Sequence, residues 1–248
     1  MLIRVEGRQP LNGTYRPSGN ANAALALIAA ALLTDQPVTL RNVPKTASTH
    51  AATSAAQAMG ATLTWTDDST LAIKADQITR RILTHEDIDV SLGTMLLVAP
   101  LLVRRQHARL ELDFPLNRIR PHLEALRDLG LDVVNSSDAV EIKTATWEKR
   151  DIILTQASVT ATAILMLLAA RLGKETVIYN AACEPHVQEL AHMLVAMGAR
   201  IEGIGSNLLR IFGVSELTGA DVTVGADHIE AASIAAMAAL TGGRVQID

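Results

Sequence analysis

Cysteine and aromatic residues are scarce in this sequence. The single cysteine, Cys183, excludes an internal disulfide and a metal site built from several cysteines, and it favours the reducing cytoplasm. Two Trp, two Tyr and two Phe are the only aromatic residues. We therefore expect a core of Ala, Leu, Ile and Val, no bound metal, and no binding that depends on stacking of aromatic side chains on bases or sugars.

The sequence also lacks an excess of basic residues and any long apolar run. A net charge of −4 argues against a general affinity for nucleic acids or anionic membranes. The longest apolar runs, Ala23–Leu33 and Ala161–Ala170, are shorter than the ~20 residues that span a membrane, and the N-terminal residues lack the apolar core of a signal peptide. We expect a cytoplasmic protein whose two apolar runs form buried helices.

Residues 158–203 predict a helix, a strand, a second helix and a second strand. The apolar helix covers Val159–Leu172 and ends at Gly173, where we expect the left-handed backbone conformation that glycine adopts easily. A strand follows at Glu175–Tyr179, and after a turn an amphipathic helix runs to Gly198. The same order of elements recurs elsewhere in the chain.

The recurrence has a period of about 70 residues. The glycines that end the three amphipathic helices are spaced by 70 and 68 residues: Gly60, Gly130 and Gly198. The N-caps of the apolar helices are expected in step with this period, at Ser18, Ser91, Ser158 and Asp227. Glu230, three residues after Asp227, completes a capping-box pattern.

Each period closes with two strands that alternate apolar and polar residues around a turn. The expected hairpins pair Thr62–Trp65 with Leu71–Lys74, Asp132–Val134 with Ala139–Ile142, and Arg200–Glu202 with Leu209–Phe212. The chain therefore contains three full units and a partial fourth.

Both ends of the chain differ from the full units. The fourth unit stops at Asp248 after its helix and strand, and the first strand, Leu2–Glu6, has no partner within the first unit. We expect residues 13–225 to form a complete domain, and residues 1–12 and 226–248 to be two pieces of an incomplete second domain. Truncation is the favoured interpretation. Ends that pack on the main domain, or a homodimer that completes the unfinished domain, are the alternatives.

Several motifs, in order along the chain, resemble the enolpyruvyl transferase family. They are Ser18–Leu25, Leu33–Pro44, Ser158–Thr162, Asn180–Pro185, Met197–Ile201 and Asp227–Ala231. The resemblance covers essentially the whole chain and is closest to the UDP-N-acetylglucosamine 1-carboxyvinyltransferase branch, whereas the loop around Asp113–Gly130 partly resembles the 3-phosphoshikimate branch. It implies an α+β fold: an inside-out α/β repeat domain of three βαβαββ units, helices inside and sheets outside, plus the start of a second such domain.

The resemblance also implies a reaction. In this family the enolpyruvyl group of phosphoenolpyruvate moves to a hydroxyl of the acceptor and phosphate leaves, without a cofactor. The implied partners are phosphoenolpyruvate and a nucleotide sugar of peptidoglycan precursor synthesis, not nucleic acid or a membrane. The chemistry needs cations for the phosphate and carboxylate, a base for the hydroxyl proton, an acid for the enol carbon, and a cleft that excludes water.

The sequence departs from the family at residues that carry this chemistry. Ala21 stands where the family has a lysine that meets phosphoenolpyruvate, and Leu92 and His228 stand where it has arginines. His228 keeps its place in the motif and is a candidate substrate-binding residue. The mobile loop is shorter than in the family and lacks the acid cysteine, so the nearby Asp113 is the candidate catalytic acid.

Two further candidates for substrate binding match family positions. Asn22 suits a contact with a substrate hydroxyl, or else bridges neighbouring units by hydrogen bonds. Glu184 suits the sugar or orients a catalytic side chain, or else satisfies N–H groups in the first turn of its helix. His186, which replaces a family carboxylate, is expected at the surface.

A basic cluster completes the candidate site. Arg118, Arg120 and His122 lie at the start of an amphipathic helix, where they suit a phosphate or diphosphate. The alternative is a solvated helix entry in which the arginines pair with Glu124 or Asp128.

Three functional hypotheses remain open. The first is an enzyme that, in complete form, transfers enolpyruvate to a UDP-sugar, with a 3-phosphoshikimate-type acceptor as the variant. The second is a degenerate, non-catalytic module that binds a nucleotide sugar or a protein, and the third is a domain without a ligand. Since the family lysine, arginines and cysteine are absent together, we expect no enolpyruvyl transfer by this chain alone.

Overall fold

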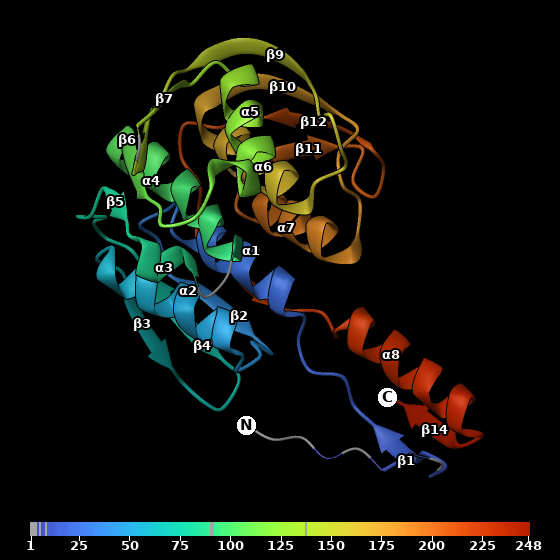
Figure 1. Ribbon diagram of the computed structural model, residues 1–248. Coiled ribbons are helices and arrows are strands. Elements are labelled where there is room, and N and C mark those ends of the chain that lie inside the picture. Colours follow the sequence, from blue (N-terminus) through green and yellow to red (C-terminus); the bar gives the residue numbers. More distant parts are fainter. Residues whose placement is uncertain (1–3, 5, 8, 90–91, 137) are drawn as a thin grey trace.

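The computed structural model describes residues 4, 6–7, 9–89, 92–136 and 138–248. It shows a large body with helices inside and sheets outside, and a smaller element that projects from it (Figure 1). The centre of the large body consists of three apolar helical segments: α1 (Ala21–Ala31), the 3₁₀ helix η1 (Leu92–Leu97) continued by α4 (Val98–Arg105), and α6 (Val159–Leu172). Most of their residues are buried, so apolar side chains on every face of these helices have partners in the core.

Shorter and amphipathic helices surround this centre. Their bounds are α2 (Ala47–Ala58), α3 (His85–Asp89), the 3₁₀ helix η2 (Leu116–Arg118), α5 (Arg120–Asp128) and α7 (Pro185–Ala196). Helix α7 packs against both α1 and α6, and α5 packs against α6. In α2, α5 and α7 the buried residues recur at helical spacing, which is the pattern that predicts an amphipathic helix.

Four-stranded sheets cover the helices. In order across each sheet, the strands are β13 (Asp221–Thr223), β2 (Val38–Arg41), β4 (Leu71–Lys74) and β3 (Thr62–Trp65); β5 (Ile82–Leu83), β6 (His107–Glu111), β8 (Ala139–Lys143) and β7 (Asp132–Asn135); and β9 (Trp147–Ile153), β10 (Gly173–Tyr179), β12 (Leu208–Phe212) and β11 (Arg200–Glu202). In each sheet the first pair is parallel and the other two are antiparallel. The three predicted hairpins, β3–β4, β7–β8 and β11–β12, are confirmed.

The glycines that follow the helices serve two different purposes. Gly60, Gly130 and Gly198 have φ of 108°, 95° and 110°, which confirms their prediction as helix-ending residues. Helix α6 also ends at Gly173 as predicted, but the expected left-handed conformation is wrong, because its φ is −99° and its backbone is extended. A Cβ at Gly173 would lie 2.1 Å from Nε1 of Trp147, its register partner on the parallel strand β9. Close contact with a ring, not backbone conformation, therefore requires glycine here.

Gly173→Ala is expected to lower the free energy of unfolding by about 1–3 kcal/mol. The added methyl group overlaps the ring of Trp147, which is buried and cannot move aside without losing its packing. Urea-induced unfolding measures the change. The control is Gly7→Ala, because nothing lies within 4 Å of the position where that Cβ would be. Equal stability of the two variants would contradict the prediction.

The projecting element joins the two ends of the described chain. Strand β1 (Asn12–Tyr15) pairs in parallel with β14 (Arg244–Ile247), and helix α8 (His228–Thr241) contacts β14. The expected strand Leu2–Glu6 lies largely outside the described residues. Strand β1 crosses the domain boundary expected after residue 12.

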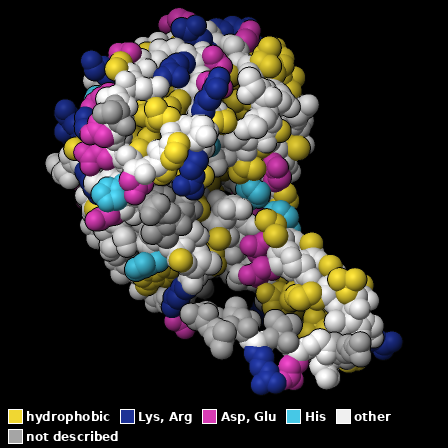
Figure 2. Space-filling view, viewed as in Figure 1, with side chains coloured by type: hydrophobic (Ala, Val, Ile, Leu, Met, Phe, Trp, Pro, Cys, Tyr) yellow, Lys and Arg dark blue, Asp and Glu magenta, His cyan; other side chains and the backbone are white. Residues whose placement is uncertain are grey.

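Helix α8 exposes much of its apolar surface. Ala238 is its only buried residue, whereas Leu240 is 87% exposed and Ile229 and Met237 are about half exposed. Hydrophobic side chains are accordingly visible over the projecting element in Figure 2. Across the described residues, we find no helix with the length and apolar character needed to cross a membrane.

Two chain segments connect the projecting element to the large body, and they lie side by side. The backbone N–H of Asn20 donates to Gly225 O over 2.8 Å, and the backbone N–H of Asp227 donates to Ser18 O over 2.7 Å. Glu189 of α7 accepts a hydrogen bond from the backbone N–H of Gly225 over 2.9 Å. Because these two connecting segments are bonded to each other and to α7, the start of α8 lies next to the N-terminal ends of α1 and α7.

Candidate functional site

One end of the large body gathers the N-terminal ends of several helices. Asn22 of α1, Gly93 of η1, Thr160 of α6 and His186 of α7 line one small cavity of about 30 Å³. Helix N-termini present backbone N–H groups and a positive partial charge, and both favour anions. The cavity is too small to enclose a substrate. These residues therefore form a wall at this end of the body and do not by themselves enclose a substrate pocket.

Side-chain caps begin α1, α6 and α8 at this end. Asn20 Oδ1 accepts a hydrogen bond from the backbone N–H of Ala23 over 2.9 Å, and Ser158 Oγ accepts one from Ala161 over 3.2 Å. Asp227 caps α8 by accepting from two backbone N–H groups. The predictions of Ser158 and Asp227 as N-caps are confirmed.

The prediction that Ser18 caps the first apolar helix is wrong. Glu230 of α8 accepts hydrogen bonds from the Ser18 backbone N–H over 2.9 Å and from its hydroxyl over 3.0 Å, and from the hydroxyl of Tyr15 over 3.0 Å. Glu230 thus binds the N-terminal connecting segment. Among the described hydrogen bonds, it makes none that would complete a capping box with Asp227. The fourth predicted cap, Ser91, lies outside the described residues.

Asn20 is a polar residue that the sequence did not single out. It is 1% exposed, and its Nδ2 has no hydrogen-bond partner in the described part of the chain. A buried amide donor without a partner is costly, so such groups commonly mark a place that a ligand or water completes. Its position two residues before Asn22, within the family-like motif, was the available signal.

Asn22 and Glu184 have side chains available for a ligand. The Asn22 side chain is exposed and makes no hydrogen bond to another described residue, so the alternative in which it bridges units is not seen. Glu184 is exposed and occupies the N-cap position of α7, but its carboxylate makes no capping hydrogen bond. The interpretation of Glu184 as a helix cap is therefore wrong. Substrate binding by either residue stays a prediction.

A histidine pair joins α7 to α8. The rings of His186 and His228 are stacked, with centroids 5.7 Å apart and planes 12° apart. The prediction that His186 lies at the surface is wrong, because the residue is only 6% exposed. The two connecting segments place the first turn of α8 over the His186 ring. Both ring nitrogens of His186 are buried without a hydrogen-bond partner among the described residues.

Burial sets the protonation of His186. Loss of solvent lowers its pKa below the ordinary value of 6.5, and the nearby His228 lowers it further, while the carboxylates of Glu184 and Asp227 act in the opposite direction. The folded protein therefore favours the neutral imidazole. This pair stands where the resemblance places a carboxylate and an arginine, so the junction carries no ion pair at these two positions.

The three residues of the basic cluster lie in three different environments. Arg120 pairs with Glu124 at 2.7 Å, one turn along α5, as one alternative from the sequence anticipates. Arg118 instead lies over the ring of Phe114, 4.7 Å from its centroid. His122 does not join the arginines, because it is only 8% exposed, and burial lowers its pKa.

Arg120 lies apart from the wall formed by the helix N-termini, as far as the described cavities show. Arg120 lines a separate cavity of about 320 Å³ with Arg127 and Asn135, and that cavity shares no residue with the one lined by Asn22. Asp113 is exposed in the loop between β6 and η2. Its role as an acid stays a prediction.

Comparison with known proteins identifies the class to which this architecture belongs. A sequence model of the EPSP synthase (3-phosphoshikimate 1-carboxyvinyltransferase) family matches residues 5–248. The chain therefore belongs to the enolpyruvyl transferase family. Its helices lie inside, its sheets lie outside, and the N-termini of several helices converge at one end.

Individual relatives match the chain over almost its whole length. The chain is 39% identical over 247 residues to UDP-N-acetylglucosamine 1-carboxyvinyltransferase of Bradyrhizobium diazoefficiens, and 36% identical over 249 residues to that of Borreliella burgdorferi. These alignments cover 98% of this chain but only 57% and 58% of the relatives. The chain therefore spans somewhat more than half the length of the curated relatives it matches.

Solved structures share the fold. The enolpyruvyl transferase NikO from Streptomyces tendae superposes with a TM-score of 0.78 at 22% identity, covering 90% of this chain and 54% of that one. EPSP synthase from Acinetobacter baumannii superposes with a TM-score of 0.68 at 17% identity, covering 91% and 52%. At these identities the likeness concerns the fold alone.

Proposed function

We propose that this chain forms one side of the active site of a UDP-N-acetylglucosamine 1-carboxyvinyltransferase-like enzyme of peptidoglycan precursor synthesis. In that reaction a substrate hydroxyl oxygen bonds to the central carbon of phosphoenolpyruvate and the carbon–oxygen bond to phosphate breaks. The convergence of helix N-termini around Asn22 and Thr160 carries the proposal, because backbone N–H groups there stabilise anionic oxygens without cationic side chains. Relatives with 34–39% identity are named as enzymes of the UDP-sugar branch, and this supports the UDP-sugar acceptor over 3-phosphoshikimate.

In this proposal the chain supplies binding and not the whole chemistry. Asn22 donates to a substrate hydroxyl, Glu184 and His228 lie at the edge of the wall, and Arg118 and Arg120 offer a second anion-binding surface. His122, which is buried, acts only through packing. Asp113 is the candidate for protonating the enol carbon. Ala21 and Leu92 provide no cation where the resemblance implies a lysine and an arginine.

We also propose that residues 13–225 act as one domain, and that residues 1–12 and 226–248 belong to a second globule. The sheet of β1 and β14 and the exposed apolar side chains of α8 support a second globule, and the pairing of β1 adds residues 13–15 to it beyond the expected boundary. A polypeptide that supplies the rest of that globule would cover α8. Sedimentation of the chain alone tests the alternative, a homodimer that covers α8 with a second copy.

The chain alone is expected to bind UDP-N-acetylglucosamine weakly and to release no phosphate from phosphoenolpyruvate. In comparable sites each such cation stabilises the transition state by roughly 3 kcal/mol. The absence of all of them is therefore expected to abolish turnover while weak substrate binding is retained. Isothermal titration calorimetry measures binding, and a phosphate-release assay measures turnover. Asn22→Ala is expected to weaken binding about tenfold.

The control for this experiment is Gln57→Ala, which removes an amide from the exposed face of α2. Phosphate release above background that Asn22→Ala abolishes would show an active enzyme and overturn the expected lack of turnover. Absence of heat with millimolar nucleotide sugar would remove the binding role. Heat with 3-phosphoshikimate instead would transfer the proposal to the other branch of the family.

A further inference from the structure

Another cavity lies at the opposite end of the central helices from the wall lined by Asn22. It has a volume of about 400 Å³ and is lined by residues after α1, in the last turns of α4 and α6, and in the loop that leads to β13. Helix α6 has 14 residues, so at 1.5 Å per residue the two ends are roughly 20 Å apart. This cavity is therefore separate from the wall lined by Asn22.

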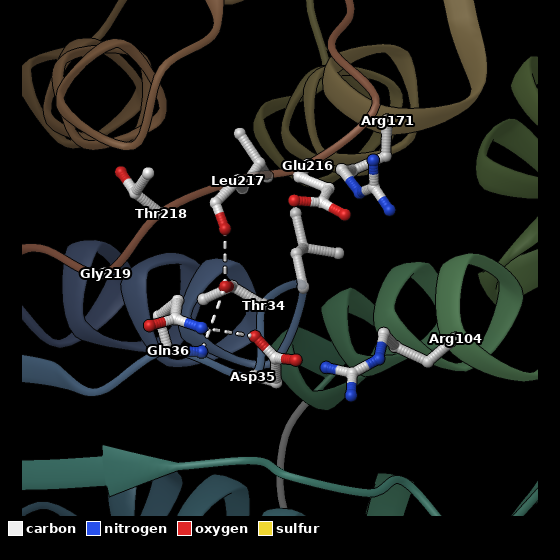
Figure 3. Close-up of a pocket in the computed structure, with 10 residues that line it drawn as sticks. Thr34, Asp35, Gln36, Arg104, Arg171, Glu216, Leu217, Thr218 and Gly219 are labelled. Atoms are coloured by element: carbon white, nitrogen blue, oxygen red, sulfur yellow. Dashed lines mark hydrogen bonds between the residues drawn. The ribbon is translucent and has the colours of Figure 1, made fainter.

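Two arginines enter the cavity from different helices. Figure 3 shows the guanidinium groups of Arg104 of α4 and Arg171 of α6 directed into it. Arg104 Nη2 donates to the carbonyls of Ala75 and Asp76 over 3.1 and 3.0 Å. Arg171 Nη1 donates to the carbonyl of Val214 over 2.8 Å and also to that of Ser215. These bonds hold both side chains in place before any ligand arrives.

Neither guanidinium is fully satisfied. Arg104 Nη1 and Arg171 Nε are buried and have no hydrogen-bond partner, and neither arginine forms an ion pair within the described ranges of the chain. Burial lowers the pKa of Arg171, and the positive charge of Arg104 adds to this effect. Two fixed, unpaired cations close enough to repel each other are an arrangement that a bound oxyanion would stabilise.

The rim of the cavity limits the size of that anion. Asp35 and Glu216 are exposed at the opening, and the charge of Glu216 opposes the lowering of the Arg171 pKa. Asp35 accepts a hydrogen bond from the Gln36 side-chain amide over 2.9 Å. These carboxylates, together with the negative ends of the helices, repel a large polyanion but leave room for a compact group that reaches the arginines.

The wall opposite the arginines is held in a defined shape. The Thr34 hydroxyl donates to Leu217 O over 2.5 Å and accepts from the backbone N–H of Gln36 over 3.1 Å, and Thr218 Oγ1 donates to Met197 O over 3.1 Å. The loop at residues 216–219 is thereby tied both to the end of α1 and to the end of α7. The cavity does not require an ordering step before a ligand enters it.

We propose that this arginine cavity, the space between Arg104 and Arg171, binds a small metabolite through a phosphate or carboxylate group. The two guanidinium groups supply positive charge, and the N–H groups that face the cavity donate to the oxyanion. The site is independent of the proposed enolpyruvyl chemistry, because its residues lie at the other end of the helices.

Titration with inorganic phosphate and, separately, with citrate tests the proposal. Both titrations use the full chain at constant ionic strength and follow amide NMR shifts of residues 34–36 and 216–219. Saturable shifts at millimolar anion are expected for at least one probe. Arg104→Gln and Arg171→Gln should each weaken that binding about tenfold, because each removes a charge-assisted hydrogen bond. The tighter probe identifies the anion class.

Two further variants keep the result interpretable if an arginine variant unfolds. Arg105→Gln changes the neighbouring arginine, which does not line the cavity, and should leave the affinity unchanged. Glu216→Gln removes an exposed rim carboxylate and should tighten anion binding about twofold or more. Absence of saturable shifts with both probes, or equal affinity in wild type, Arg104→Gln, Arg171→Gln and Glu216→Gln, would overturn the proposal.

Discussion

Trp147→Ala is expected to lower the free energy of unfolding by about 3–5 kcal/mol. Trp147 begins β9, is 7% exposed and lies over Gly173 of the adjacent strand. Its indole N–H donates to Thr176 Oγ1 over 2.8 Å. Substitution leaves a cavity above a glycine that has no side chain to fill it, and removes the donor to a fully buried hydroxyl. Urea-induced unfolding followed by circular dichroism measures the loss.

The second tryptophan is a matched control for this variant. Trp65 on β3 is 41% exposed, and Lys45 Nζ lies 5.8 Å from its ring centroid. Trp65→Ala should therefore cost about 1 kcal/mol or less. Trp147→Phe keeps much of the buried apolar surface but loses the N–H, and it should fall between the two. If Trp147→Ala cost no more than Trp65→Ala, the contact between β9 and β10 would have no special part in stability.

The free energy of unfolding should also fall as the pH drops from 7.5 to 5.5. Burial lowers the pKa of both His122 and His186 below the value of 6.5 that each has when unfolded. Above pH 6.5 both states are neutral and the stability is fully present. Below it, the unfolded chain binds protons that the folded chain resists, and this costs at most about 1.4 kcal/mol per pH unit for each histidine. Urea titrations at several pH values measure the slope.

Single substitutions show which histidines cause the free energy of unfolding to depend on pH. His122→Gln and His186→Gln should each flatten it, whereas His192→Gln, an exposed position on the same helix as His186, should not. Protonation of carboxylates does not account for a change in the free energy of unfolding in this pH range. For example, its bond to Arg109 lowers the pKa of Glu141 below the ordinary 4.5, so its protonation destabilises the fold only at more acidic pH. A wild-type stability that stays constant across this range would show that neither histidine resists protonation.

Much of the fold could be predicted because its signals are local. The alternation of apolar and polar residues in Thr62–Trp65 and Leu71–Lys74 predicts strands, and the intervening turn residues predict their pairing. Gly198 ends a helix because its own backbone needs a positive φ. Gly173 looks the same in the sequence but is required by the ring of Trp147, 26 residues earlier, and no local pattern reveals such a contact.

The candidate site was less predictable because it depends on burial. Ser18 and Asn20 both have the side chain of an N-cap, and the choice between them is made by Glu230, more than 200 residues away, which binds Ser18. His186 has the helical position of a surface residue but is covered by the start of α8. His122 stands beside basic residues in the sequence, while its ring turns into the core.

The order of helices and strands, the hairpins and the resemblance to a family follow from the amino-acid sequence alone, because periodicity, turn residues and short motifs act over a few neighbouring positions. Which polar groups lose solvent, and which of them find hydrogen-bond partners, depends instead on the packing of the folded chain. Asn20 and His186 at one end of the central helices, and Arg104 and Arg171 at the other, retain buried nitrogen atoms that have no hydrogen-bond partner among the described residues. That outcome depends on how segments far apart in the chain pack together, so it emerges only in three dimensions.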